Sequence, residues 1–174
     1  MGPRATIGHA TVCKDLEYLC LGEYASIGRL NWITGYPKTG AQYQQEDNRR
    51  AELILERHAA VTGRHLLDCT NSIHIGQFAT VGGVRSTILT HSIDLKASRQ
   101  ASRPVTIGDY CFVSTCCVVL GGSTLPNHSV LAAHSLLNKQ LVDSYVLYGG
   151  TPARPIDQLP HDLGYFTRQK GCVV

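Results

Sequence analysis

Residues 107–142 read IGDYCF VSTCCV VLGGST LPNHSV LAAHSL LNKQLV when the chain is divided into blocks of six. The first position of every block is aliphatic, and the fifth is small in five of the six blocks. A period of six fits neither the 3.6-residue turn of a helix nor a plain alternating strand. It predicts a short extended segment followed by a corner, repeated along the chain.

Three such segments close one triangular coil. The aliphatic side chain of each block points into a narrow interior, and the small residue lets the chain turn close to its neighbours. Successive coils then stack as parallel strands about 4.8 Å apart. Upstream blocks place Leu21, Ile27, Ile33, Leu55, Val61, Leu67, Ile75 and Val81 in the aliphatic position, after which Thr87 breaks the rule. The pattern predicts an all-β fold, a triangular parallel β-helix of about six coils, and leaves its hand open.

Three stretches escape the repeat, within what we expect to be a single domain over residues 1–174. Residues 36–52 are polar and predict an external loop. Residues 90–104 interrupt the coils a second time, and residues 157–174 predict a short C-terminal cap packed on the last coil. The segment ELILERHAA fits either a strand or an amphipathic helix.

Composition excludes several classes of partner. The formal net charge is only +3 with 17% charged residues, and no Lys/Arg cluster is interleaved with aromatics, which argues against nucleic acid. No apolar run approaches the roughly 20 residues needed to span a bilayer. The N-terminus MGPRATIGHA lacks the apolar stretch of a secretory signal. Seven cysteines without a CxxC pair favour reduced, small buried residues, no metal, and a cytoplasmic location.

Several motifs together resemble those of the hexapeptide-repeat acyltransferases. They are LLDCTNSIHIGQF (66–78), LTHSID (89–94), the blocks from residue 107, and GGTPARPI (149–156). The resemblance is to the maltose/galactoside O-acetyltransferases and to polysaccharide-biosynthesis acetyltransferases. It implies a left-handed parallel β-helix and a homotrimer with active sites between protomers. It also implies acetyl-CoA as the co-substrate, its acyl group passing to a hydroxyl or an amine.

His91 is the candidate general base. It lies in ILTHSIDL (88–95), where the repeat is interrupted, and such interruptions supply functional loops. A neutral imidazole, which titrates near pH 6.5 when unperturbed, can accept a proton from an attacking hydroxyl at cellular pH. The resemblance implies a nearby catalytic acid, Asp94. Either Asp94 or a backbone carbonyl could hold the second ring nitrogen; the alternative for His91 is a turn histidine that bonds only backbone.

The resemblance also implies binding residues. Asp68 corresponds to an aspartate that contacts the acceptor, with Arg64 and His65 beside it; the alternative for Asp68 is turn stabilisation. On the donor side, cations of the last coils would meet phosphates of coenzyme A, small residues would leave room for the pantetheine arm, and an aromatic ring would flank the acyl group. These residues are Asn138, Lys139 and Arg154, then Ala133 and Gly150, then Phe112.

The sequence therefore predicts a coenzyme A-dependent O-acetyltransferase acting on a sugar or polysaccharide precursor. N-acetylation of an amino sugar and a non-enzymatic trimeric scaffold remain as alternatives. A zinc-dependent carbonic anhydrase of similar architecture is disfavoured, because His128 and His134 lie one block apart and thus on different faces of the triangle.

Overall fold

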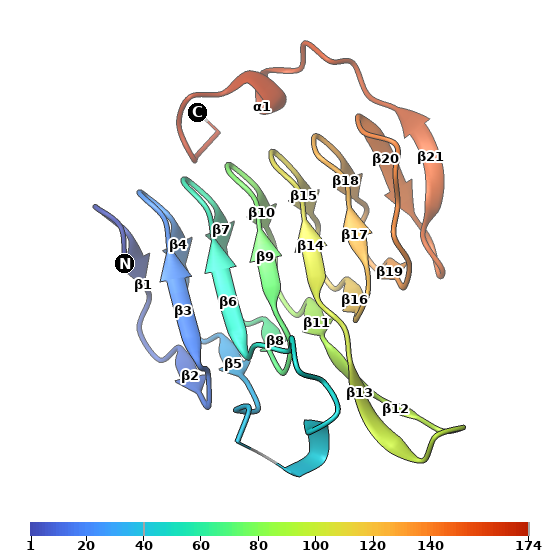
Figure 1. Cartoon of the computed structure of the whole chain (residues 1–174). Coiled ribbons are helices and arrows are strands. Elements are labelled where there is room, and N and C mark those ends of the chain that lie inside the picture. Colours follow the sequence, from blue (N-terminus) through green and yellow to red (C-terminus); the bar gives the residue numbers. More distant parts are fainter. Residues whose placement is uncertain (40, 174) are drawn as a thin grey trace.

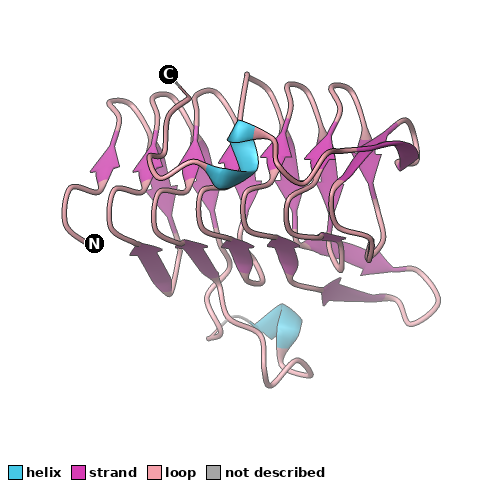
Figure 2. Cartoon of the chain, turned by 90° about the horizontal axis from the view of Figure 1, so that it is seen from above, coloured by secondary structure: helices cyan, strands magenta, loops and turns pink. Residues whose placement is uncertain are grey.

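The chain winds into a three-sided parallel β-helix in the computed structural model, which describes residues 1–39 and 41–173 (Figures 1 and 2). Position 40 of the predicted external loop and position 174 of the predicted cap lie outside the described residues. Each turn of the chain contributes one short strand to each of three sheets, here called sheets A, B and C, so that neighbours in a sheet come from successive coils.

Sheet A has eight strands: β1 (Thr6–Ile7), β4 (Ser26–Ile27), β7 (Ala60–Val61), β10 (Thr80–Val81), β15 (Phe112–Val113), β18 (Val130–Leu131), β20 (Val146–Gly149) and β21 (Arg154–Gln158). Sheet B has six: β2 (Val12–Lys14), β5 (Trp32–Thr34), β8 (Leu66–Asp68), β11 (Thr87–Leu89), β16 (Val118–Leu120) and β19 (Leu136–Leu137). Sheet C has five: β3 (Tyr18–Leu21), β6 (Glu52–Leu55), β9 (Ile73–Ile75), β14 (Val105–Ile107) and β17 (Thr124–Leu125). All pairs in these sheets are parallel except β20 with β21.

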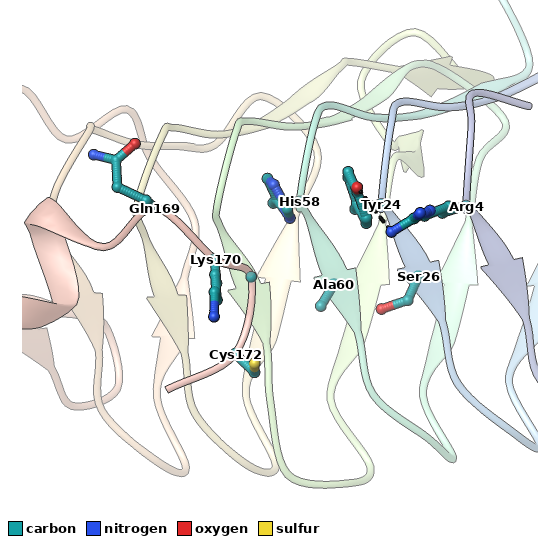
Figure 3. A pocket seen from close by; sticks show the side chains of 9 residues that line it. Arg4, Tyr24, Ser26, His58, Ala60, Gln169, Lys170 and Cys172 are labelled. Carbon is teal, nitrogen blue, oxygen red and sulfur yellow. Dashed lines mark hydrogen bonds between the residues drawn. The ribbon is translucent and has the colours of Figure 1, made fainter. Parts of the chain in front are cut away.

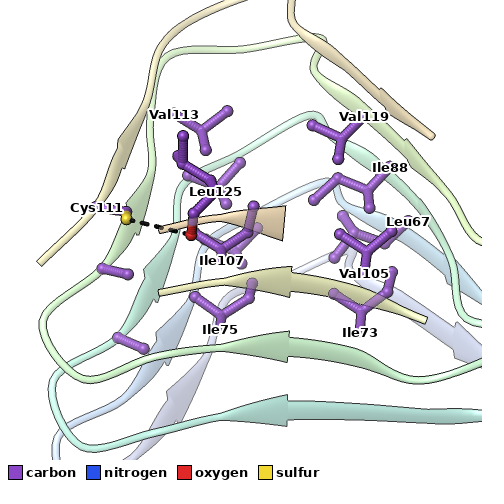
Figure 4. Packing of buried hydrophobic residues seen from close by; sticks show 14 of the residues in the cluster. Leu67, Ile73, Ile75, Ile88, Val105, Ile107, Cys111, Val113, Val119 and Leu125 are labelled. Atoms are coloured by element: carbon purple, nitrogen blue, oxygen red, sulfur yellow. Dashed lines mark hydrogen bonds between the residues drawn. The ribbon is translucent and has the colours of Figure 1, made fainter. Parts of the chain in front are cut away.

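The core is a stack of aliphatic side chains that share one register. In sheet B, Ile33 pairs with Leu67, Leu67 with Ile88 and Ile88 with Val119, and all four are fully buried. Figure 4 shows buried residues of all three sheets pointing into the interior, among them Ile88 of sheet B, Ile75 of sheet C and Val113 of sheet A. The small residues at the fifth positions, such as Ser129, are buried at the corners as the repeat predicts.

The break at Thr87 is an insertion of one residue. Ile88, not Thr87, points inward, seven positions after Val81 instead of six, and the extra residue is absorbed in the preceding corner. The prediction of buried cysteines holds for Cys111, among others, but Cys13 and Cys172 are exposed. Cys13 occupies the inward column of sheet B, but it belongs to the first coil, which no earlier coil covers.

Two excursions leave the corner between sheets B and C, and both project from the same side of the helix (Figure 1). The first covers residues 35–51 between β5 and β6 and includes a 3-10 turn (Ala41–Tyr43); the strand alternative for ELILERHAA is correct. The second is an antiparallel hairpin of β12 (His91–Asp94) and β13 (Arg99–Ser102). The interruption predicted at 90–104 thus contains a hairpin.

The C-terminal segment contacts the last coil, where His161 and Phe166 pack on Tyr145, and it also runs back over earlier coils, which the prediction of a cap on the last coil did not include. The segment continues past β21 through the short helix α1 (Gly164–Thr167) to Arg168. There the carbonyl of Arg168 accepts from the hydroxyl of Tyr110, and its guanidinium donates to the carbonyl of Phe78. The segment covers a row of stacked rings from successive coils and adds its own His161 at one end, with successive centroids 3.9–5.2 Å apart: Tyr24, His58, Phe78, Tyr110, His128, Tyr145 and His161. The guanidinium of Arg168 lies over the rings of Phe78 and Tyr110, and these cation–π contacts help to hold the segment against the coils. Within the described residues, no helix has the length and apolar character needed to cross a membrane.

Candidate active site

His91 forms a hydrogen-bonded pair with Asp68. Asp68 ends β8, and its partner in the adjacent coil is Leu89 at the end of β11, so the next corner brings His91 directly over Asp68. The ring atom Nδ1 of His91 lies 2.5 Å from Oδ2 of Asp68. The imidazole is 44% exposed, whereas the carboxylate is 9% exposed. The pair thus joins a buried acid to a ring that solvent and ligands can reach.

The Asp68 carboxylate accepts four further hydrogen bonds. Oδ1 accepts from the backbone N–H of Thr70 at 3.1 Å and from its hydroxyl at 2.7 Å. Oδ2 accepts from the backbone N–H groups of Thr90 and His91, each at 3.2 Å. Burial acts to raise the pKa of Asp68, but the hydrogen bonds from Thr70 and His91 outweigh it and hold the pKa below its ordinary value.

An ionised Asp68 fixes the tautomer of His91. A carboxylate can only accept hydrogen bonds, so Nδ1 of the ring must carry the proton that it donates. Nε2 then presents its lone pair away from Asp68. This arrangement can accept a proton at Nε2 and stabilise the imidazolium that results.

The second ring nitrogen of His91 is held neither by Asp94 nor by a backbone carbonyl, the two partners that the sequence left open, but by Asp68. His91 and Asp94 stand three apart in strand β12, and side chains an odd number of positions apart point to opposite faces of a strand. Asp94 Oδ1 accepts from the backbone N–H groups of Lys96 and Ala97 and so stabilises the hairpin turn. Asp68, for which the resemblance implied acceptor binding with turn stabilisation as the alternative, bonds the ring of His91 and also accepts the turn bond from the backbone N–H of Thr70.

The exposed side of His91 opens into a pocket of about 310 Å³ between the two excursions. It is lined by Thr34, Gly35, Tyr36, Gln42, Tyr43, Asp68, Thr70, His91 and Gln100. Sequence reasoning missed the contribution of the 35–51 loop. Its position in the repeat could have revealed it. When the coils are aligned in sequence, the loop leaves the same corner as the hairpin, two coils earlier.

Arg64 and His65 lie elsewhere, so the structure does not bring them to His91. They form the corner that precedes β8, whereas Asp68 stands at its far end. His65 is 2% exposed, and its ring bonds the Thr62 hydroxyl at 2.9 Å and the backbone N–H of Ser86 at 3.1 Å. Burial lowers the pKa of His65, in keeping with a neutral ring that has a structural role.

The residues predicted to bind coenzyme A lie in three places: the corner between sheets B and C, the corner between sheets A and B, and the face of sheet A. Asn138 and Lys139 are exposed and turn from β19 toward the Thr124 bridge, which is the corner His91 occupies, two coils further on. That separation is about 10 Å along the axis at ~4.8 Å per coil. Ala133, Gly150 and Arg154 are exposed at or beyond the corner between sheets A and B.

Phe112 lies on sheet A, where its ring meets Tyr165 of the C-terminal segment edge-on at 6.1 Å. This chain alone therefore does not gather the predicted donor residues around His91.

A larger hollow of about 730 Å³ lies on sheet A beside the end of the C-terminal segment (Figure 3). Its histidine, His58, is stacked between Tyr24 and Phe78, and among the described residues no carboxylate bonds its ring. It lacks the acid and base that the His91 pocket combines. The described part of the chain also contains no group of three or more His, Cys, Asp or Glu side chains placed to hold a metal ion.

No protein-family model matches the chain. Solved structures that share its fold include AntD, an N-acyltransferase from Bacillus cereus, with a TM-score of 0.78 at 12% identity over 96% of this chain and 86% of that one. A hexapeptide transferase family protein from Anaplasma phagocytophilum aligns with a TM-score of 0.60 at 17% identity over 94% and 85%. A hexapeptide-repeat acetyltransferase from Vibrio cholerae aligns with a TM-score of 0.55 at 23% identity over 88% and 73%. The prediction of a left-handed parallel β-helix like that of the hexapeptide-repeat acyltransferases is confirmed.

Proposed function

We propose that this protein transfers an acetyl group from coenzyme A to a hydroxyl of a sugar or polysaccharide precursor, with His91 as the general base. The observation that carries the proposal is the Asp68–His91 pair, with Nε2 of the ring directed away from a buried carboxylate beside an open pocket. The likeness in fold to acyltransferases supports it. AntD has been crystallised with 3-hydroxybutyryl-CoA, and a mutant of it with coenzyme A.

The reaction needs one base and no protein nucleophile, because the thioester is already activated. Nε2 of His91 takes the proton of the acceptor hydroxyl while the hydroxyl oxygen forms a bond to the thioester carbonyl carbon. The carbon–sulfur bond then breaks, and the imidazolium returns its proton to the departing thiolate. Asp68 stabilises the imidazolium between these two proton transfers. A positioned base of this kind contributes roughly 10²–10⁴-fold to the rate.

The free polar groups of the pocket favour a hydroxyl acceptor over an amine. An amine is an ammonium ion at neutral pH and calls for an uncommitted carboxylate, but Asp68 already accepts five hydrogen bonds from the protein. The remaining groups, such as Tyr36, Gln42 and Gln100, are neutral. N-acylation is the second candidate, because a mutant of the structurally similar AntD was crystallised with an amino sugar nucleotide.

A homotrimer would complete the donor site under this proposal. Each cleft would take His91 from one protomer and donor contacts, including Lys139 and Arg154, from the next. The outward face of sheet B supports such an assembly. Val12, Trp32, Leu66 and Val118 share one register there, with Thr87 between the last two. Trp32 is 51% exposed and Leu66 39%, and an apolar row of this kind marks an interaction surface.

Thiol release from acetyl-CoA, measured over a panel of sugars, amino sugars and sugar nucleotides, tests the proposal. We expect a sugar without an amino group to stimulate release, and His91→Ala to lower kcat roughly 10²–10⁴-fold with little change in stability. His74→Ala is the matched control, because His74 also pairs with a carboxylate, Glu56 at 3.1 Å, but lies outside the pocket on sheet C. Full turnover by His91→Ala would refute the role of the base, and stimulation by amines alone would favour N-acylation.

A further inference from the structure

We propose that Glu46 is a positioning residue for His91, acting through the hairpin that carries the base. The inference rests on the proposed function. The carboxylate of Glu46, in the 35–51 loop, accepts from the backbone N–H of Ser102 at 2.8 Å and from the Ser102 hydroxyl. Ser102 is the residue directly opposite His91 in the antiparallel pair of β12 and β13. Glu46 therefore bonds to the position across the hairpin from the catalytic ring.

On the β12 side the base of the hairpin is tied to the coil through Asp68, which accepts from the backbone N–H of His91, while the β13 side depends on other contacts. The two strands of the hairpin pair only with each other, and their residues are exposed or half-buried, with Ile93 58% exposed and Leu95 in the turn 83% exposed. An isolated two-stranded hairpin is marginally stable in water. Order in β13 must come from contacts with other segments; besides Glu46, the side chain of Asn71 donates to the Ser102 hydroxyl at 2.9 Å, and that of Gln45 donates to the carbonyl of Gln100 at 3.1 Å.

The loop that presents Glu46 is itself anchored to the segment that carries Asp68. Arg49 is 2% exposed, and its guanidinium donates to the carbonyl of Thr70 at 2.6 Å and to those of Tyr36 and Pro37. The same guanidinium lies over the ring of Tyr43, 4.6 Å from its centroid. Thr70 in turn donates twice to the Asp68 carboxylate.

One loop consequently fastens both members of the pair. Arg49 bonds Thr70 in the turn that follows Asp68, and Glu46 bonds Ser102 in the strand opposite His91. Because a hydrogen bond weakens steeply with distance and angle, the contact between Asp68 and His91 depends on both attachments. At metal sites, removal of a residue that orients a ligand commonly costs 10–100-fold in activity, and we expect a loss of this order for Glu46, which likewise does not touch the reacting atoms.

Steady-state kinetics of Glu46 variants in the full-length protein test this role. We expect Glu46→Ala to lower kcat about 10–100-fold while KM for acetyl-CoA changes less than about twofold. Glu46→Gln should restore kcat to within about threefold of wild type, because its amide oxygen can accept from the Ser102 N–H and its amide group can donate to the hydroxyl. The double variant Glu46→Ala, Ser102→Ala should lose less kcat than the product of the two single-variant losses, because both substitutions remove the same contact.

Gln45→Ala is the matched control. Gln45 donates from the same loop to the same hairpin, at the carbonyl of Gln100, but Gln100 stands opposite Ile93 and not opposite His91. Its kcat should remain at the wild-type level. Wild-type kcat in Glu46→Ala, a raised KM for the acceptor at unchanged kcat, or equal loss in Glu46→Gln and Glu46→Ala would each overturn the inference. If His91→Ala is inactive while Glu46→Ala is normal, only this inference fails; if His91→Ala is fully active, the proposed function fails first.

Discussion

Replacing Asp68 by asparagine separates the charge of the carboxylate from its shape. An asparagine amide keeps one acceptor oxygen and turns the other position into a donor. If the amide nitrogen faced His91, it would oppose three donors: the backbone N–H groups of Thr90 and His91 and the ring Nδ1–H. If it faces Thr70, the hydroxyl can rotate to accept, and only the Thr70 backbone N–H loses its partner. The second orientation costs less, so the contact to His91 is kept while its charge is lost.

The magnitude follows from that orientation. One buried N–H without a partner costs about 1–3 kcal/mol, so the free energy of unfolding should fall by this amount. A charge-assisted hydrogen bond is roughly twice as strong as a neutral one, and the imidazolium formed during the reaction therefore loses about 1–1.5 kcal/mol of stabilisation. At 1.36 kcal/mol per factor of ten, kcat should fall about tenfold.

The assay is thiol release from acetyl-CoA at saturating acceptor, beside urea unfolding of the same preparation. His91→Ala should lose at least as much activity as Asp68→Asn, because the base itself is gone. A kcat for Asp68→Asn within about threefold of wild type would show that the buried charge does not support the base, and the reasoning from the pair would be wrong.

Three further predictions concern the donor site, the thiols and acid stability. Lys139→Ala should raise KM for acetyl-CoA several-fold at unchanged kcat, as loss of a phosphate contact requires; a lowered kcat at constant KM would contradict this. Burial raises the pKa of the Cys111 thiol to about 12, so maleimide should label the exposed Cys172 in the native protein and Cys111 only after unfolding, as mass spectrometry of peptides would show. Because the pKa of folded Asp68 lies below its ordinary value, its contribution to stability is complete above about pH 4 and disappears as pH falls through the folded value. Acid unfolding of Asp68→Asn should lack that component.

The repeat predicted the architecture because every aliphatic position has the same role, which is to place one apolar side chain in the interior of the coil. A side chain every six residues must enter the narrow interior, and the columns through Ile33, Leu67 and Val119 form as expected. Periodicity failed where the chain departs from six residues, as at Thr87 and in the two excursions, since an insertion leaves the neighbouring coils in register and gives no signal of its own shape.

The candidate base could also be found from the sequence, but not its partner. His91 and Asp94 are close along the chain, whereas Asp68 lies 23 residues earlier and approaches only because adjacent coils stack. The contributions of Glu46 and Arg49 were hidden in the same way, in a polar loop without a motif.

The order of residues by itself determined that this chain stacks in triangular coils and that a histidine stands where the stack is interrupted. Only the tertiary structure decided which carboxylate faces that histidine and which loop braces its hairpin. The physical reason is that a coil is specified by contacts within a few residues, while the site is built across coils, between groups that the turn of the helix sets side by side.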